Sequence, residues 1–174
     1  GIPDFKLEKS IIDRRLKILE KEGIIFHTCK EVGTDIPVSE LEKEFDIILL
    51  TGGATIRRKL PIKGHDLKGV VQAMDFLKHQ NEVVDLKIDQ QINYSATSKN
   101  VIVIGGGDTG SDCIGTSNRH KAKSVTNFEI LEKPSTERTE ENPWPYWPFT
   151  LKTSSSHEEG IERKWSIMTK EFIG

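Results

Sequence analysis

A strand-like run that leads into a glycine turn is the feature that most constrains this chain. Four β-branched residues at positions 101–104 precede the turn Gly105-Gly106-Gly107-Asp108-Thr109-Gly110, and a helix-like pattern follows over residues 111–118. The spacing G-x-G-x-x-G binds a dinucleotide when it stands between a strand and a helix in this way. A glycine-rich turn without a ligand is the alternative, and the order of elements favours the binding site.

Each glycine of the pattern has an expected role. Gly105 would make the turn, Gly107 would let the backbone approach a pyrophosphate, and Gly110 would let the helix pack closely on the strand. The start of the helix adds free N–H groups and a partial positive charge for the phosphates. Asp108 and Thr109 belong to the same candidate site. Because a carboxylate repels a pyrophosphate, Asp108 is expected to cap the helix or to bind through water.

An acidic residue stands where the dinucleotide pattern requires one. Glu129 lies near the end of the next predicted strand, residues 124–131, roughly 20 residues beyond the glycine turn. An acid there suits a ribose 2′-OH and repels a 2′-phosphate, so NADH is slightly favoured over NADPH. Lys133 and Arg138 on the following loop can still receive a phosphate, which leaves both nucleotides open. The alternative for Glu129 is a solvated acid at a strand end.

A second strand–glycine unit is predicted in the first third of the chain. Residues 24–29 and 46–50 are apolar runs typical of buried strands, and the second run ends in Thr51-Gly52-Gly53-Ala54. Ligands of open α/β sheets bind at the carboxyl ends of the strands. The predicted fold class is therefore α/β, with Rossmann-like nucleotide-binding units.

Other elements follow from periodicity and breakers. A first helix is expected to start at a Ser10 cap and to end at Gly23. Further helices are expected over residues 39–45 and 69–79, and a last strand over residues 164–172. The intervening word Asn142-Pro143-Trp144-Pro145-Tyr146-Trp147-Pro148-Phe149 excludes a regular helix, and we expect an extended lid packed by its own aromatic side chains.

The composition excludes several classes of function. The 174 residues are 35% hydrophobic and 30% charged, with 25 basic and 27 acidic side chains, so no basic excess points to nucleic acid. No apolar run approaches the ~20 residues of a membrane helix. Cys29 and Cys113 are too far apart in sequence for a metal or iron–sulfur motif, and as buried thiols they weakly indicate the cytoplasm. The five histidines are scattered, so no metal site is expected; His157 is either near a ligand or structural.

The chain resembles the small (beta) subunit of glutamate synthase, within the flavoproteins that carry two dinucleotide-binding domains. The resemblance covers essentially the whole chain. The Gly-Gly-Gly-Asp-Thr-Gly word is shared with relatives such as dihydropyrimidine dehydrogenase, whereas the Pro-Trp-Pro and Lys-Thr-Ser-Ser-Ser-His-Glu-Glu-Gly words are more specific. The matching segments are residues 1–7, 50–54, 101–113, 142–148 and 151–160.

The resemblance implies a glutathione-reductase-type arrangement, in which an NAD(P)H domain interrupts an FAD domain. Residues 1–64 would then be part of the FAD-binding domain and residues 65–174 the NAD(P)H-binding domain. The first FAD fingerprint and a cysteine-rich iron–sulfur region are expected outside this chain, which we interpret as an internal fragment. The residues expected to line the FAD site are Val32, Gly33, Thr51, Gly52 and Gly53.

The reaction that the resemblance implies has two halves. The small subunit passes a hydride from NAD(P)H to FAD, and iron–sulfur centres then carry electrons to the large (alpha) subunit. There glutamine and 2-oxoglutarate become glutamate. Because the cofactors supply this chemistry, no catalytic residue is expected in the chain, and the fragment alone is expected to be inactive and to hold FAD poorly. The alternatives are a ferredoxin-NADP reductase or dihydropyrimidine dehydrogenase type of subunit, or a non-catalytic nucleotide-binding module.

Overall fold

The chain forms two compact units. The computed structural model describes all residues except 55, 59, 87, 90 and 92–93. One unit comprises Glu8–Arg57, and the other comprises Gly1–Leu7 together with Arg58–Gly174. The second unit holds a parallel sheet with helices, so the expectation of an α/β fold is confirmed at that level.

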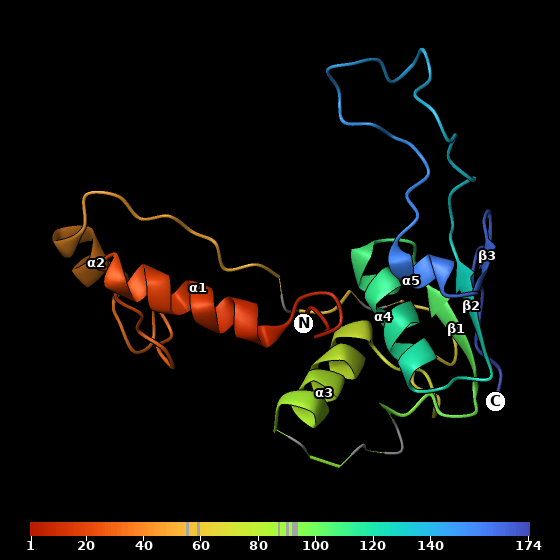
Figure 1. Cartoon of the computed structure of the whole chain (residues 1–174), viewed down its shortest axis with the longest axis horizontal. Coiled ribbons are helices and arrows are strands. Elements are labelled where there is room, and N and C mark those ends of the chain that lie inside the picture. The colour runs from red at the N-terminus through yellow and green to blue at the C-terminus, as the bar shows by residue number, and fades with distance from the viewer. Residues whose placement is uncertain (55, 59, 87, 90, 92–93) are drawn as a thin grey trace. The chain divides into compact units, whose positions relative to one another are not determined.

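The sheet of the larger unit has three parallel strands in the order β1-β2-β3. The strands are β1 (Asn100–Ile104), β2 (Ser124–Phe128) and β3 (Glu162–Lys164). Helix α4 (Asp108–Arg119) connects β1 to β2, and the short helix α5 (Ser155–Glu158) precedes β3 (Figure 1). A parallel pair needs such a crossover connection. The predicted order of strand, glycine turn, helix and strand is therefore present.

Helix α4 carries one face of the core. It packs against β1 and β2 and against helix α3 (Ala73–Leu86). Burial raises the pKa of the Cys113 thiol to about 12, so this side chain packs as a small apolar group. The expectation of buried cysteines is wrong for Cys29, which is exposed. The core cluster consists of Leu77, Val103, Cys113, Ile114 and Val125.

The smaller unit is built on two helices, α1 (Lys9–Lys21) and α2 (Val38–Glu44). Gly23 ends α1 as predicted: its φ is +94°, and Ile24 N–H bonds the Leu19 carbonyl at 3.0 Å. The predicted cap at Ser10 is wrong. The helix begins two residues earlier, Glu8 takes the cap position, and no side-chain capping bond forms.

Helix α3 starts and ends later than its predicted span of 69–79. It runs over Ala73–Leu86, because Gly69 has a φ of +98°, which a right-handed helix does not accommodate. Asn81 and Glu82, which lie beyond the predicted end at residue 79, belong to its last turns.

Three predicted strands differ from the structure. Residues 24–29 and 46–50 form no ladder, Cys29 has a left-handed φ of +55°, and the apolar side chains of both runs are exposed. A strand needs a neighbour for its N–H and C=O groups, and no described residue pairs with either run in a ladder. The predicted strand 164–172 is largely replaced by β3, which ends at Lys164. Ser166 then takes a left-handed φ of +58°, which interrupts the extended backbone.

The proline–tryptophan word lies in a long loop that leaves the end of β2 and returns to α5 (Figure 1). The expectation that its aromatic rings pack on one another is wrong. Trp144, Tyr146 and Trp147 remain 80%, 67% and 75% exposed. The loop is held through its backbone instead, because the Asn142 side chain accepts from Phe149 N–H at 2.8 Å.

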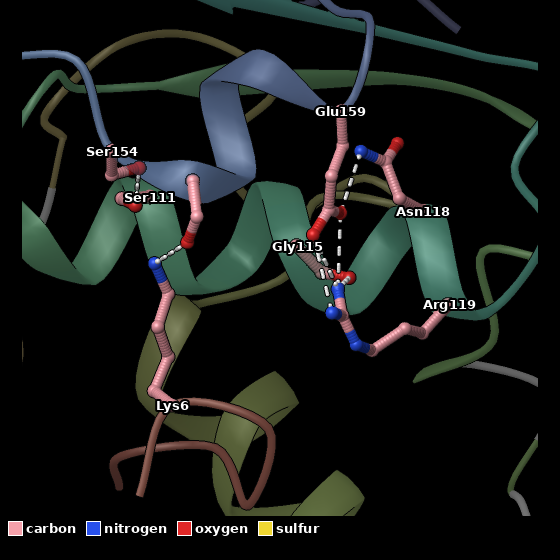
Figure 2. Close-up of polar contacts among 8 residues, drawn as sticks. Lys6, Ser111, Gly115, Asn118, Arg119, Ser154 and Glu159 are labelled. Carbon is pink, nitrogen blue, oxygen red and sulfur yellow. Dashed lines mark hydrogen bonds and ion pairs between the residues drawn. The ribbon is translucent and has the colours of Figure 1, made fainter.

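Polar contacts fasten α5 to α4 at both ends of the short helix (Figure 2). Ser154, just before α5, lies 2.5 Å from Ser111 between their hydroxyl oxygens. At the other end, Arg119 donates to both carboxylate oxygens of Glu159 at 3.0–3.1 Å, and Asn118 donates to the same group. Burial raises the pKa of Glu159, but these hydrogen bonds outweigh it and leave the pKa lowered.

The first residues of the chain add a third layer to this contact. The Phe5 ring lies under the Arg119 guanidinium, whose central carbon is 3.5 Å from the ring centroid. Lys6 reaches the Ser155 hydroxyl at 3.2 Å, and Arg119 also donates to the Gly115 carbonyl at 2.9 Å (Figure 2). The absent side chain of Gly115 leaves the space that the Phe5 ring fills.

His157 has a structural part in α5. It closes a capping box, in which its Nδ1 accepts from the Ser154 N–H at 3.1 Å. Burial, followed by the positive charges of Arg163 and Lys6, lowers the pKa of His157, and Glu129 opposes this shift. The folded chain therefore favours the neutral ring.

We predict that protonation of His157 in the capping box makes the folded chain less stable in mild acid. The folded pKa of His157 is below the ordinary value of ~6.5, so its contribution is complete above about pH 6.5 and is lost as the pH falls below it. The thermal midpoint should drop between about pH 7.5 and about pH 5.5. In H157Q the drop should be smaller, because glutamine keeps the cap without titrating. His120, whose pKa burial also lowers, accounts for the remainder. An equal drop in both proteins would contradict this role.

Candidate functional site

The glycine turn is clamped to the end of β2. Gly105 has a φ of +119°, a backbone conformation that favours glycine, and its N–H donates to the Phe128 carbonyl at 2.8 Å. The fully buried Asn127 side chain donates to the carbonyls of Val103 and Gly105 at 3.1 and 3.0 Å. The carboxyl ends of β1 and β2 therefore meet at this turn.

The other two glycines of the pattern differ in what surrounds them. A Cβ on Gly107 would meet nothing within 4 Å, so the backbone there faces open space. A Cβ on Gly110 would collide with the Gly105 carbonyl oxygen and would lie 3.7 Å from the Val103 side chain. Gly107 thus leaves room for an approaching group, and Gly110 allows close packing of the helix on the turn.

The first turn of α4 points N–H groups out of the helix end. Gly107 is the N-cap, and Asp108 is the first helical residue, with no side-chain capping bond. The expectation that Asp108 caps the helix is therefore wrong, since Gly107 occupies that position. Asp108 and Thr109 are exposed. The first N–H groups of a helix have no acceptor within it, and with the helix dipole they suit an anion.

Glu129 follows β2 directly and is ion-paired. Its Oε1 accepts from Arg163 Nη2 at 2.7 Å, and the two side chains are 17% and 12% exposed. The alternative of a solvated acid at a strand end is therefore wrong. Sequence reasoning did not find Arg163, because its residue lies on β3 and only the sheet brings it beside Glu129.

Gly106 is a further residue that the pattern did not assign. An added Cβ at Gly106 would collide with the Glu129 carboxylate, and its Oε2 is the nearest atom. The carboxylate thus lies against the glycine turn, while its other oxygen binds Arg163. The available signal was the run of three glycines, where the fingerprint requires only the first and third.

The basic residues of the loop after β2 have other partners. Arg138 donates to the carbonyls of Tyr146 and Asn142 at 2.9 and 3.4 Å, so it holds the proline–tryptophan loop. The Lys133 ammonium lies 5.1 Å from the centroid of the Trp165 ring. Arg163 contacts the same ring at 5.0 Å, which places this lysine in the group of side chains around Glu129.

The residues expected to line an FAD site all belong to the smaller unit. Val32 forms a bridge with Ile36, and Gly33, with a φ of +96°, donates to the Ile36 carbonyl at 2.7 Å. The other three, Thr51, Gly52 and Gly53, are exposed and outside helices and strands, and Gly53 has a φ of +67°. In the described ranges no hydrogen bond or bridge joins these two segments.

Among the described residues, no group of three or more His, Cys, Asp or Glu side chains could hold a metal ion. Over those same parts of the chain, none of the helices has the length and apolarity to cross a membrane.

Comparison with known proteins gives matches over the whole chain, although no family model matches it. The NADPH glutamate synthase small chain of Mycobacterium tuberculosis is 46% identical over 100% of this chain. The NADPH small chain of Bacillus subtilis is 42% identical over 99% of it, and the NADH glutamate synthase of Saccharomyces cerevisiae is 44% identical over 100%.

The chain spans only part of each relative. It covers 36% of the two bacterial small chains and 8% of the yeast protein. The matches include the glycine turn, the Glu129 region and the proline–tryptophan loop, because they extend over essentially the whole sequence. The sequence and its matches thus agree, and the chain belongs to the glutamate synthase small-chain family.

Proposed function

We propose that residues 65–174 form a Rossmann-like NAD(P)H-binding domain. The observation that carries this proposal is the position of Glu129 against the glycine turn between β1 and α4. Gly105, Gly107 and Gly110 supply a turn with open space over its backbone, and the exposed start of α4 suits a pyrophosphate. Asp108 and Thr109 border that position, and the Glu129 carboxylate would accept from the adenosine ribose.

The choice between the two nucleotides depends on the same carboxylate. An acid at this position favours a ribose 2′-OH over a 2′-phosphate, so we propose a modest preference for NADH. The relatives carry both names, NADPH for the bacterial small chains and NADH for the yeast protein. Arg138 would bind a 2′-phosphate only after releasing its two carbonyl partners in the loop.

We further propose that residues 1–64 belong to an FAD-binding domain. The family membership supports this assignment, since the relatives are glutamate synthases. Its candidate flavin-side residues are Val32, Gly33, Thr51, Gly52 and Gly53. FAD, when bound, would accept a hydride from the nicotinamide. The chain's own residues would hold the dinucleotide and exclude water, and none is proposed as catalytic.

The wider reaction is assigned by family alone. Electrons would pass through iron–sulfur centres outside this chain to a large subunit that makes glutamate from glutamine and 2-oxoglutarate. The name "small chain" of the bacterial relatives supports such a partner. A cytoplasmic setting fits the two free cysteines, since thiols stay reduced there.

The first test is direct binding of the nucleotide. Calorimetric titration of the chain with NADH and with NADPH should give saturable binding of both, with the tighter constant for NADH. FAD is titrated in parallel, because its binding reports on the proposed FAD-binding domain and the pyridine nucleotides report on the other domain. Failure to bind either pyridine nucleotide would contradict the assignment of the glycine turn. Tighter binding of NADPH would contradict the role given to Glu129.

Two glycine-to-alanine variants separate binding from folding. In G107A the new methyl group enters open space, so we expect a cost below about 1 kcal/mol in stability but at least about a tenfold weaker binding of NADH. In G110A the methyl group collides with backbone, so we expect a loss of about 1–3 kcal/mol in the free energy of unfolding. Denaturant unfolding and calorimetry measure the two effects. Unchanged nucleotide affinity in folded G107A would show that no ligand approaches there.

A further inference from the structure

We infer that Arg163 is a specificity-determining residue, because it sets the charge that Glu129 presents to the dinucleotide. The inference rests on the proposed nucleotide site and deepens it. It concerns the group on the 2′ carbon of the adenosine ribose: a neutral hydroxyl in NADH and a phosphate in NADPH. On this account the site distinguishes the hydroxyl from the phosphate with an ion pair and not with a lone acid.

The two oxygens of the Glu129 carboxylate have different surroundings. Oε1 accepts from Arg163 at 2.7 Å, whereas Oε2 lies nearest to the position that a Cβ on Gly106 would take. The oxygen beside the glycine turn is therefore the one available to a ribose hydroxyl. Arg163 orients the carboxylate in this position by holding the other oxygen.

Arg163 is itself fixed by its surroundings. Its Nη1 donates to the Lys152 carbonyl at 3.1 Å, and the Trp165 ring lies 5.0 Å from the guanidinium carbon. Only 12% of the side chain is exposed, so solvent screens the pair weakly. A fixed cation this close offsets much of the carboxylate charge. The repulsion of a 2′-phosphate by Glu129 is thereby reduced, while the hydrogen bond to a 2′-OH is kept.

A purely structural part for the pair makes a different prediction. If Arg163 only ties β3 to the end of β2, its loss would lower stability and weaken both nucleotides alike. A charge-setting part changes the ratio of the two dissociation constants, because NADPH carries the extra phosphate and NADH does not. The ratio of the NADPH to the NADH dissociation constant is therefore the measurement that separates the two parts.

Calorimetric titration of the chain with NADH and NADPH tests the inference on the wild type and three variants. In R163Q the carboxylate is uncompensated, and we expect the ratio of the NADPH to the NADH dissociation constant to rise about tenfold. In R163K the charge remains, so the ratio should stay within about threefold of the wild type. In E129Q the cation is uncompensated, and the ratio should fall about tenfold in favour of NADPH.

Arg119 offers the matched control. R119Q breaks another arginine–glutamate pair, with Glu159 at the far end of α4, and should leave the ratio unchanged. Thermal unfolding identifies any variant that fails to fold. An unaltered ratio in folded R163Q would overturn this inference and leave the proposed function standing, whereas an unaltered ratio in E129Q would also contradict the NADH preference assigned to Glu129. If R163Q does not fold, the double variant E129Q/R163Q decides: its ratio should be about tenfold above that of E129Q, and an equal ratio in the two would overturn the inference. Binding of neither nucleotide by the wild type would overturn both.

Discussion

The larger unit depends on the contact between the glycine turn and the end of β2. The side chain of Asn127, which is fully buried, donates to the carbonyls of Val103 and Gly105, and the Gly105 N–H donates to the Phe128 carbonyl. An unsatisfied group here would be costly, because buried backbone groups need partners. The same contact aligns the ends of both strands and sets the start of α4. It thereby brings the Glu129 carboxylate against the turn.

Helix α4 lies at the centre of the larger unit, where it contacts β1, β2 and α5. Two arginine–glutamate ion pairs join these elements. Arg119 binds Glu159 and connects the end of α5 to α4, and Arg163 binds Glu129 and connects β3 to the end of β2. The Phe5 ring covers the first of these arginines. The first pair is remote from the glycine turn, and the second borders it. The same kind of ion pair is thus structural at Arg119 and is proposed to discriminate between nucleotides at Arg163.

Sequence patterns predicted the local parts of the site and missed the long-range ones. The strand, turn and helix around Gly105 followed from neighbouring residues, and so did the end of α1 at Gly23. Arg163 was missed because its partner is distant in sequence and no pattern links the two. The apolar runs 24–29 and 46–50 have strand-like composition, but a strand forms only when another segment pairs with it. The predicted cap at Ser10 was wrong because residue preferences do not determine a helix boundary to the exact residue.

The central claim is that the glycine turn and Glu129 together hold a pyridine dinucleotide. Amide chemical-shift mapping of the labelled chain during titration with NADH tests it most directly, because it locates the ligand residue by residue. We predict that the largest shifts fall on residues 105–110 and on Glu129, and that they saturate with one dissociation constant. Saturable shifts that leave these residues unmoved, or no shifts at saturating NADH, would contradict the account.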